Sequence, residues 1–172
     1  LHTILRRQRQ MCIRDRLPSE CPISISRAMK FQLNELSSPS ADIAAELDSL
    51  IIDVNRVLSD EMGRWLLSAH HHDAQSELSL FVAETQKQLV VDRTFIDAQT
   101  GIRWIIDYKT SHPADDALLT DFFNEEAARY RDQLLRYQSA MQRYDQCHHP
   151  DVVDTRVALY FSALAKLHEV KV

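Results

Sequence analysis

The chain has few cysteines, and their spacing does not suit a metal cluster. Its 172 residues include three, Cys12, Cys21 and Cys147, and no Cys-x-x-Cys pair occurs. Structural zinc sites and four-cysteine iron–sulfur clusters are built from thiolate ligands, often closely spaced. The cysteine pattern therefore weighs against both kinds of centre.

Long apolar runs and an excess of positive charge are also missing. No apolar run is long enough to cross a bilayer, and no apolar segment follows the first arginines as it would in a signal peptide. We therefore expect a cytoplasmic protein without a membrane partner. The net charge of -5 argues against a protein that coats nucleic acid by bulk electrostatics.

Length and composition predict one domain behind a leading segment of different character. Residues 11–16 resemble the translation of a sequencing adapter, and residues 17–40 are rich in serine and proline. We expect residues 1–40 to be a scar and a poorly ordered leading segment. Residues 41–172 are then long enough to form a single core.

Apolar periodicity predicts an α/β order of elements in that domain. Helical spacing indicates two helices before the first strand and a long, regular helix in the second half, while alternation and β-branched content indicate strands. The expected helices cover residues 43–58, 59–67 and 121–144, and the expected outer strands cover 78–82, 155–161 and 167–172.

The most informative stretch covers residues 90–110 and reads as two apolar strands around a glycine-containing turn. β-Branched and aromatic residues on both sides of such a turn predict a hairpin. If pairing is symmetric about the bond between residues 99 and 100, Asp92 lies directly opposite Asp107, with Cβ atoms ~5 Å apart. Side chains alternate along a strand, so Lys109 shares the face of Asp107.

Two opposed carboxylates on a half-buried sheet repel each other unless a cation lies between them or one acid is protonated. Mg²⁺ answers this need, since it binds one or two carboxylates and keeps waters that a phosphate substrate can replace. A neighbouring lysine can orient or help deprotonate an attacking water and offset charge on the phosphate. The pattern therefore predicts a metal site for phosphodiester hydrolysis.

Three points leave alternatives open. Asp-x-Lys arises often by chance, because surface strands commonly pair acids with Lys or Arg. A one-residue bulge at Gly101 would shift the pairing and make Asp92 and Asp107 diagonal neighbours. Glu77 on the first strand could approach the metal, although a surface glutamate is the more common outcome.

The long helix contributes two further candidates. Gln133 and Tyr137 lie one turn apart, so their polar ends project together on the flank of the apolar stripe. They could face the hairpin. In the alternative arrangement Tyr137 is a core residue with its hydroxyl at the rim, and Gln133 is solvated.

Four motifs follow one another in a characteristic order. They read Val-Asp-Arg-Thr-Phe, Trp-Ile-Ile-Asp-Tyr-Lys-Thr, Tyr-Arg-Asp-Gln-Leu-Leu-Arg-Tyr and Arg-Val-Ala-Leu-Tyr-Phe, starting at residues 91, 104, 130 and 156. Over residues 56–172 their order and spacing resemble the C-terminal nuclease domain of RecB-like and AddA-like helicase-nucleases, in the PD-(D/E)XK superfamily. The resemblance implies a restriction-endonuclease-like core, a mixed β-sheet flanked by helices.

The resemblance also implies a catalytic metal site. Asp92, Asp107 and the main-chain carbonyl of Tyr108 would bind Mg²⁺, for which Mn²⁺ would substitute. Lys109 would activate or position the attacking water.

Residues around this centre would support it and contact the substrate. Gln133 and Tyr137 match family positions that serve both the site and the DNA. Arg93, next to the first acid, could reach a phosphate or could only neutralise Asp97 or Asp107.

The implied function is that of a Mg²⁺-dependent DNA exonuclease module of a helicase-nuclease, acting in double-strand break processing and recombinational repair. Its partners would be DNA, upstream helicase domains of the same chain and, as a further option, a second helicase-nuclease subunit. The alternative is a catalytically inactive nuclease-fold module that binds DNA or a partner subunit. The intact acids and lysine speak against it, because binding alone does not require opposed carboxylates.

The sequence departs from the family at one metal ligand. A histidine on an upstream helix contributes to the family's site, and no matching segment occurs here, so we expect the domain to be N-terminally incomplete. The run from His70 to His72 is interpreted as a connecting loop, more often solvated than metal-binding. His148 and His149 are expected at a helix end, where a cation suits the dipole.

Overall fold

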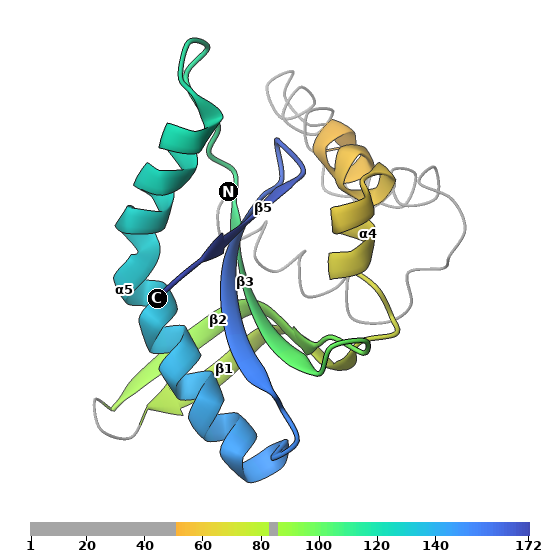
Figure 1. The fold of residues 1–172 in the computed structure, drawn as a ribbon, viewed down its shortest axis with the longest axis vertical. Helices are drawn as coiled ribbons and strands as arrows, with labels where there is room; N and C mark the ends of the chain where they lie inside the picture. The colour runs from red at the N-terminus through yellow and green to blue at the C-terminus, as the bar shows by residue number, and fades with distance from the viewer. Residues whose placement is uncertain (1–50, 83–85) are drawn as a thin grey trace, which may run out of the picture.

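A five-stranded sheet forms the centre of the computed structural model, which describes residues 51–82 and 86–172 (Figure 1). The strands lie in chain order across the sheet. They are β1 His72–Val82, β2 Lys87–Ile96, β3 Ile102–Lys109, β4 Asp154–Phe161 and β5 Lys166–Val170. β3 and β4 pair in parallel and the other neighbours pair antiparallel, so the predicted mixed sheet is confirmed.

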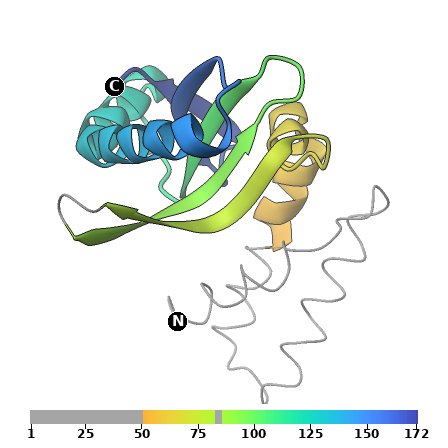
Figure 2. The ribbon, with the colours of Figure 1, turned by 90° about the horizontal axis from the view of Figure 1, so that it is seen from below.

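Helices lie on both faces of this sheet. The long helix α5, Leu119–His148, covers one face, and the short helix α4, Glu61–Leu66, lies on the other (Figures 1 and 2). The chain is also helical over residues 51–59. The predicted leading segment 1–40 and the first part of the predicted helix 43–58 fall outside the described residues.

The boundaries of α4 and β1 differ from the prediction, each for a local reason. α4 begins two residues later than expected, since the Asp60 side chain accepts a hydrogen bond from the Gly63 N–H at 3.1 Å and caps the helix. β1 begins at His72 instead of Leu78, and its first residues alternate between exposed and half-buried without apolar side chains.

The sheet and helices enclose two apolar clusters, one on each face. Beneath α5, the buried Leu134 and Met141 belong to the same cluster as Ile105 of β3. Beneath α4, Leu66 belongs to a second cluster with Ile106 of β3. Alternate residues of β3 therefore serve opposite cores, as the period of a strand requires.

The hairpin between β2 and β3 has the predicted register. Its pairs run from Ile96–Arg103 to Arg93–Ile106 without a shift, so the bulged alternative is wrong. Gly101 has a φ of +69°, which favours glycine, and its N–H donates to the Asp97 carbonyl at 2.9 Å. A Cβ at this position would also lie 2.9 Å from the Val153 side chain.

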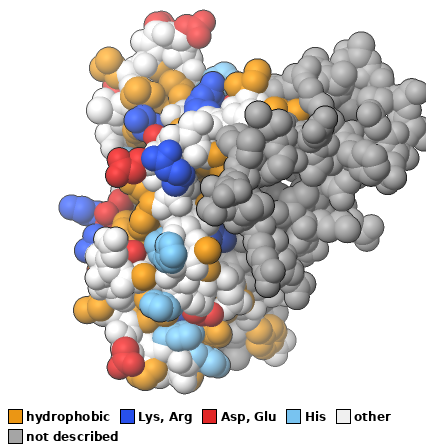
Figure 3. All heavy atoms as spheres, turned by 90° about the vertical axis from the view of Figure 1, so that its right-hand side faces the viewer, with side chains coloured by type: hydrophobic (Ala, Val, Ile, Leu, Met, Phe, Trp, Pro, Cys, Tyr) orange, Lys and Arg blue, Asp and Glu red, His pale blue; other side chains and the backbone are white. Residues whose placement is uncertain are grey.

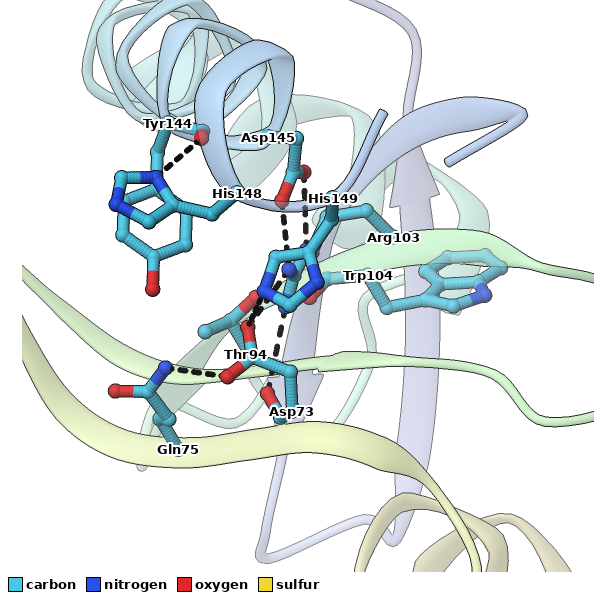
Figure 4. A network of polar contacts seen from close by, with 9 residues as sticks. All are labelled: Asp73, Gln75, Thr94, Arg103, Trp104, Tyr144, Asp145, His148 and His149. Carbon is cyan, nitrogen blue, oxygen red and sulfur yellow. Dashed lines mark hydrogen bonds and ion pairs between the residues drawn. The ribbon is translucent and has the colours of Figure 1, made fainter. Parts of the chain in front are cut away.

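A buried ion-pair network fixes the C-terminal end of α5 to the sheet (Figure 4). Arg103 of β3 is fully buried, and its guanidinium donates to both carboxylate oxygens of Asp145 at 3.0 and 2.6 Å. It also donates to the Asp73 carboxylate of β1 at 2.8 Å, which lies 3.1 Å from the His149 imidazole. Bidentate geometry of this kind makes strong contacts. One side chain of β3 thus joins α5 to β1.

We predict that Arg103→Met costs ~3–5 kcal/mol of unfolding free energy, because it leaves two acids near the core without their cation. Urea denaturation would measure this loss. Arg156→Met is the matched control, since Arg156 pairs with Asp154 at the surface and should cost only ~0–1 kcal/mol. Equal, small losses in the two variants would contradict the structural role of the network.

Candidate active site

The two predicted acids lie where β2 and β3 cease to pair backbone to backbone. Asp92 and Asp107 are the next residues of the register after Arg93 and Ile106. In place of a backbone bond, the Asp92 carboxylate accepts a hydrogen bond from the Tyr108 N–H at 3.0 Å. Asp107 is 4% exposed, so one acid is buried beside another that is half-buried.

Lys109 shares the face of Asp107, as predicted. Its Nζ lies 2.5 Å from the Asp107 carboxylate. The same ammonium lies 3.3 Å from the centre of the Tyr130 ring on α5. The Tyr108 side chain points to the opposite face, where its ring contacts that of Tyr160.

The Tyr108 main chain is directed toward Asp92. Its N–H donates to that carboxylate, and in an extended strand the N–H and C=O of one residue point to the same side. The Tyr108 carbonyl therefore faces the gap between β2 and β3. The next carbonyl, of Lys109, faces the other way and accepts from the Ser162 N–H at 3.1 Å.

Gln133 and Tyr137 face the hairpin, so the arrangement with a solvated Gln133 is wrong. The Gln133 amide donates to the Asp107 carboxylate at 2.9 Å and to the Tyr137 hydroxyl oxygen at 2.9 Å. Tyr137 is also a core residue, with 9% of its surface exposed. Burial raises its pKa, and the charges of Asp107 and Asp92 raise it further. The Tyr137 hydroxyl is therefore neutral, as an ordinary phenol is at neutral pH, and its surroundings disfavour ionisation further.

Two more residues of α5 contact the end of β3, and sequence reasoning missed both. Tyr130 contacts Lys109, and the buried Glu126 accepts a hydrogen bond from the Ser111 hydroxyl at 2.9 Å. Spacings of four and three residues put both on the helix face of Gln133. That periodicity was a usable signal, because a contact between the same helix face and the hairpin was one of the two arrangements considered for Gln133 and Tyr137.

Arg93 lies on the α4 side of the sheet, away from the Asp107 carboxylate. It is 6% exposed, and its guanidinium donates to the Leu66 carbonyl at 2.9 Å and the Ser76 hydroxyl at 3.2 Å. Burial lowers its pKa. Asp97, one of the two acids that Arg93 could have neutralised, accepts from the Thr100 hydroxyl at 2.6 Å.

Glu77 neighbours Asp92 in the sheet. β1 and β2 pair at Ser76–Arg93 and Leu78–Val91, which brings Glu77 beside Asp92, although its φ of +54° interrupts the regular strand. Within residues 51–82 and 86–172, no group of three or more His, Cys, Asp or Glu side chains converges. A cation here would thus rely on two carboxylates, a carbonyl and water.

The histidine run is structural, and part of the interpretation as a solvated loop is wrong. The His71 side chain is buried with its ring stacked on Phe95, and its Nε2 lies 2.6 Å from the Trp65 carbonyl. A carbonyl only accepts, so this nitrogen carries the proton. His72 begins β1 instead of lying in the loop.

The second histidine pair lies at a helix end, as predicted. His148 is in the last turn of α5, and its Nδ1 lies 2.8 Å from the Tyr144 carbonyl. His149 follows as the C-cap and approaches Asp73 (Figure 4). Both side chains are therefore engaged at the end of the helix.

Comparison with known protein families and with curated proteins finds no match to this chain. Among the described residues, no helix combines the length and apolar character needed to cross a bilayer. The chemistry of the site must therefore be judged from its own geometry. That geometry joins a buried acid, a second acid, a lysine, an amide and a neutral phenol.

We predict that the protein loses stability in acid partly through His71. Burial lowers the His71 pKa below its ordinary value of 6.5, although the Trp65 carbonyl and Asp97 oppose this. Below about that pH the unfolded chain binds a proton that the folded chain resists, so stability falls as pH falls. Urea unfolding of His71→Gln from neutral to mildly acid pH should show a shallower loss than wild type. An unchanged slope, matching that of the exposed control His112→Gln, would contradict this.

Proposed function

We propose that the chain is a Mg²⁺-dependent deoxyribonuclease that hydrolyses phosphodiester bonds at the face carrying Asp92, Asp107 and Lys109. The observation that carries the proposal is the buried Asp107 carboxylate, held by Gln133 and Lys109 beside a second acid. Burying like charges together is unfavourable without a cation. A site that keeps them together is best explained by a metal-binding role.

The donor set fits Mg²⁺. Two carboxylates and the Tyr108 carbonyl offer oxygen ligands at one gap in the sheet, and Mg²⁺ takes few protein oxygens while keeping waters. Bound there, Mg²⁺ would act as a Lewis acid toward the phosphate and lower the pKa of a water. Lys109 supplies the balancing positive charge in the metal-free protein.

The chain's own groups have distinct roles in hydrolysis. Lys109 orients the attacking water and offsets charge on the phosphate. The water oxygen bonds to phosphorus, the bond to the leaving sugar oxygen breaks, and the proton lost by the water passes to solvent while the leaving oxygen gains one. Gln133 fixes Asp107, and the Tyr137 hydroxyl, which accepts from Gln133, keeps its own proton to donate.

The wider context rests on the resemblance to helicase-nucleases. The mixed sheet with helices on both faces is compatible with a restriction-endonuclease-like core, and an exonuclease module in double-strand break repair is the function that accompanies it. On the described part of the face shown in Figure 3, basic side chains lie mostly in the upper half and histidines gather in the lower half. Because the net charge is -5, DNA affinity would depend on contacts at the site more than on a long-range positive field.

We predict different effects on metal binding from substituting Asp107 and from substituting Lys109, both on β3. Asp107→Asn removes a ligand and should weaken Mn²⁺ binding by at least the roughly 10–100-fold typical of lost supporting contacts. Lys109→Ala should not weaken it, because it removes a cation that competes for Asp107. Calorimetric titration of both variants measures this. Equal losses would mean that the role of the lysine is misassigned.

We predict Mg²⁺-dependent cleavage of end-labelled single- or double-stranded DNA that Lys109→Ala abolishes. Lys166→Ala, an exposed lysine on β5, is the matched control and should cut normally. The position of the label reports the polarity of cutting. DNA that is bound but never cut by wild type would reject the proposal in favour of a binding module.

A further inference from the structure

The contact between Lys109 and Tyr130 gives the lysine a second partner besides Asp107. Its Nζ lies 3.3 Å from the Tyr130 ring centre and 2.5 Å from the Asp107 carboxylate. The lysine side chain is 14% exposed, so little water competes for the ammonium. A cation over the face of an aromatic ring is attracted by the ring quadrupole, and Tyr130 is half-buried.

We propose that Tyr130 is a positioning residue, whose ring face holds the Lys109 ammonium beside Asp107. Its consequence for catalysis rests on the proposed nuclease function, while its effect on the position of the lysine does not. The phenol oxygen has no part in this role, which requires only the ring.

Lys109 needs a second partner because a metal ion would compete with it for the Asp107 carboxylate. In the metal-free protein the carboxylate attracts the ammonium directly. A divalent cation on the same carboxylate would take that partner away and repel the lysine. The lysine stem is long and flexible, so an unheld ammonium would move into solvent. A neutral ring attracts the ammonium without consuming a metal ligand.

The part of α5 that carries Tyr130 is held against the end of β3 by hydrogen bonds before and after this residue. One turn earlier, Glu126 accepts from Ser111, which lies just beyond Lys109. One turn later, Gln133 donates to Asp107, which lies just before it. Tyr130 is therefore aligned with Lys109 by contacts that do not involve either residue.

The first test is spectroscopic and does not need activity. In protein with ¹³C-labelled lysine, the ε-methylene protons of Lys109, identified with Lys109→Ala, should be shifted upfield by the ring. Tyr130→Phe should keep this shift and Tyr130→Leu should lose it. Tyr144→Leu is the matched control, because Tyr144 is a half-buried tyrosine of the same helix that stacks on His148. It should leave Lys109 unchanged.

The second test is kinetic. Tyr130→Leu should lower kcat about tenfold with little change in the KM for DNA, because the ring acts on the lysine and not on substrate binding. Tyr130→Phe and Tyr144→Leu should both remain close to wild type. A loss in Tyr130→Leu alone separates positioning of Lys109 from a general loss of helix packing, because the latter would lower the activity of Tyr144→Leu equally.

The outcomes distinguish this proposal from the nuclease proposal. An unshifted Lys109 in wild type, or a shift that persists in Tyr130→Leu, would overturn the positioning role whatever the activity. An active wild type with unchanged kcat in Tyr130→Leu would also overturn it. A wild type that never cuts, yet shows the shift only when residue 130 is aromatic, would support the positioning role and reject the nuclease.

Discussion

The alignment of α5 along β3 is the constraint on which the site depends. Near the C-terminal end of α5, Arg103 donates hydrogen bonds to Asp145. Near the N-terminal end, Glu126 accepts a hydrogen bond from Ser111. Between them, apolar packing and the hydrogen bond from Gln133 to Asp107 hold the same face of the helix against the same face of the strand. A slip of one helical turn would separate all of these pairs at once, so polar partners at both ends specify one position that apolar packing alone would leave less defined.

The same alignment places three charged side chains, those of Asp92, Asp107 and Lys109, close together. Asp107 is buried beside Asp92, and the Lys109 ammonium contacts the Asp107 carboxylate, which offsets part of the negative charge. In the proposed nuclease, a metal ion bound to Asp107 would displace this lysine from the carboxylate. The Tyr130 ring would then be the remaining partner of the Lys109 ammonium. A buried acid beside a second acid and a lysine is a candidate functional site on physical grounds.

The sequence allowed the local geometry to be predicted and left the tertiary contacts open. Alternation fixed the shared face of Asp107 and Lys109, and the turn length fixed the register of the hairpin, because both are short-range properties. The contact of Arg93 with the Leu66 carbonyl and the burial of the His71 side chain were missed. Each depends on where α4 and the loop after it cross the sheet. Arg103 was overlooked for the same reason, as its partners lie 30 and 42 residues away. The nuclease activity and its metal stay predictions.

The most direct test of the central claim is to locate a paramagnetic divalent cation on the protein. Substoichiometric Mn²⁺ should broaden the backbone amide signals of Asp92 and of residues 107–109, together with the Gln133 side-chain amide, before any others. This result would establish a metal centre at the gap between β2 and β3. Broadening that begins elsewhere, for example around Asp73 and His149, or no selective broadening at all, would contradict the account.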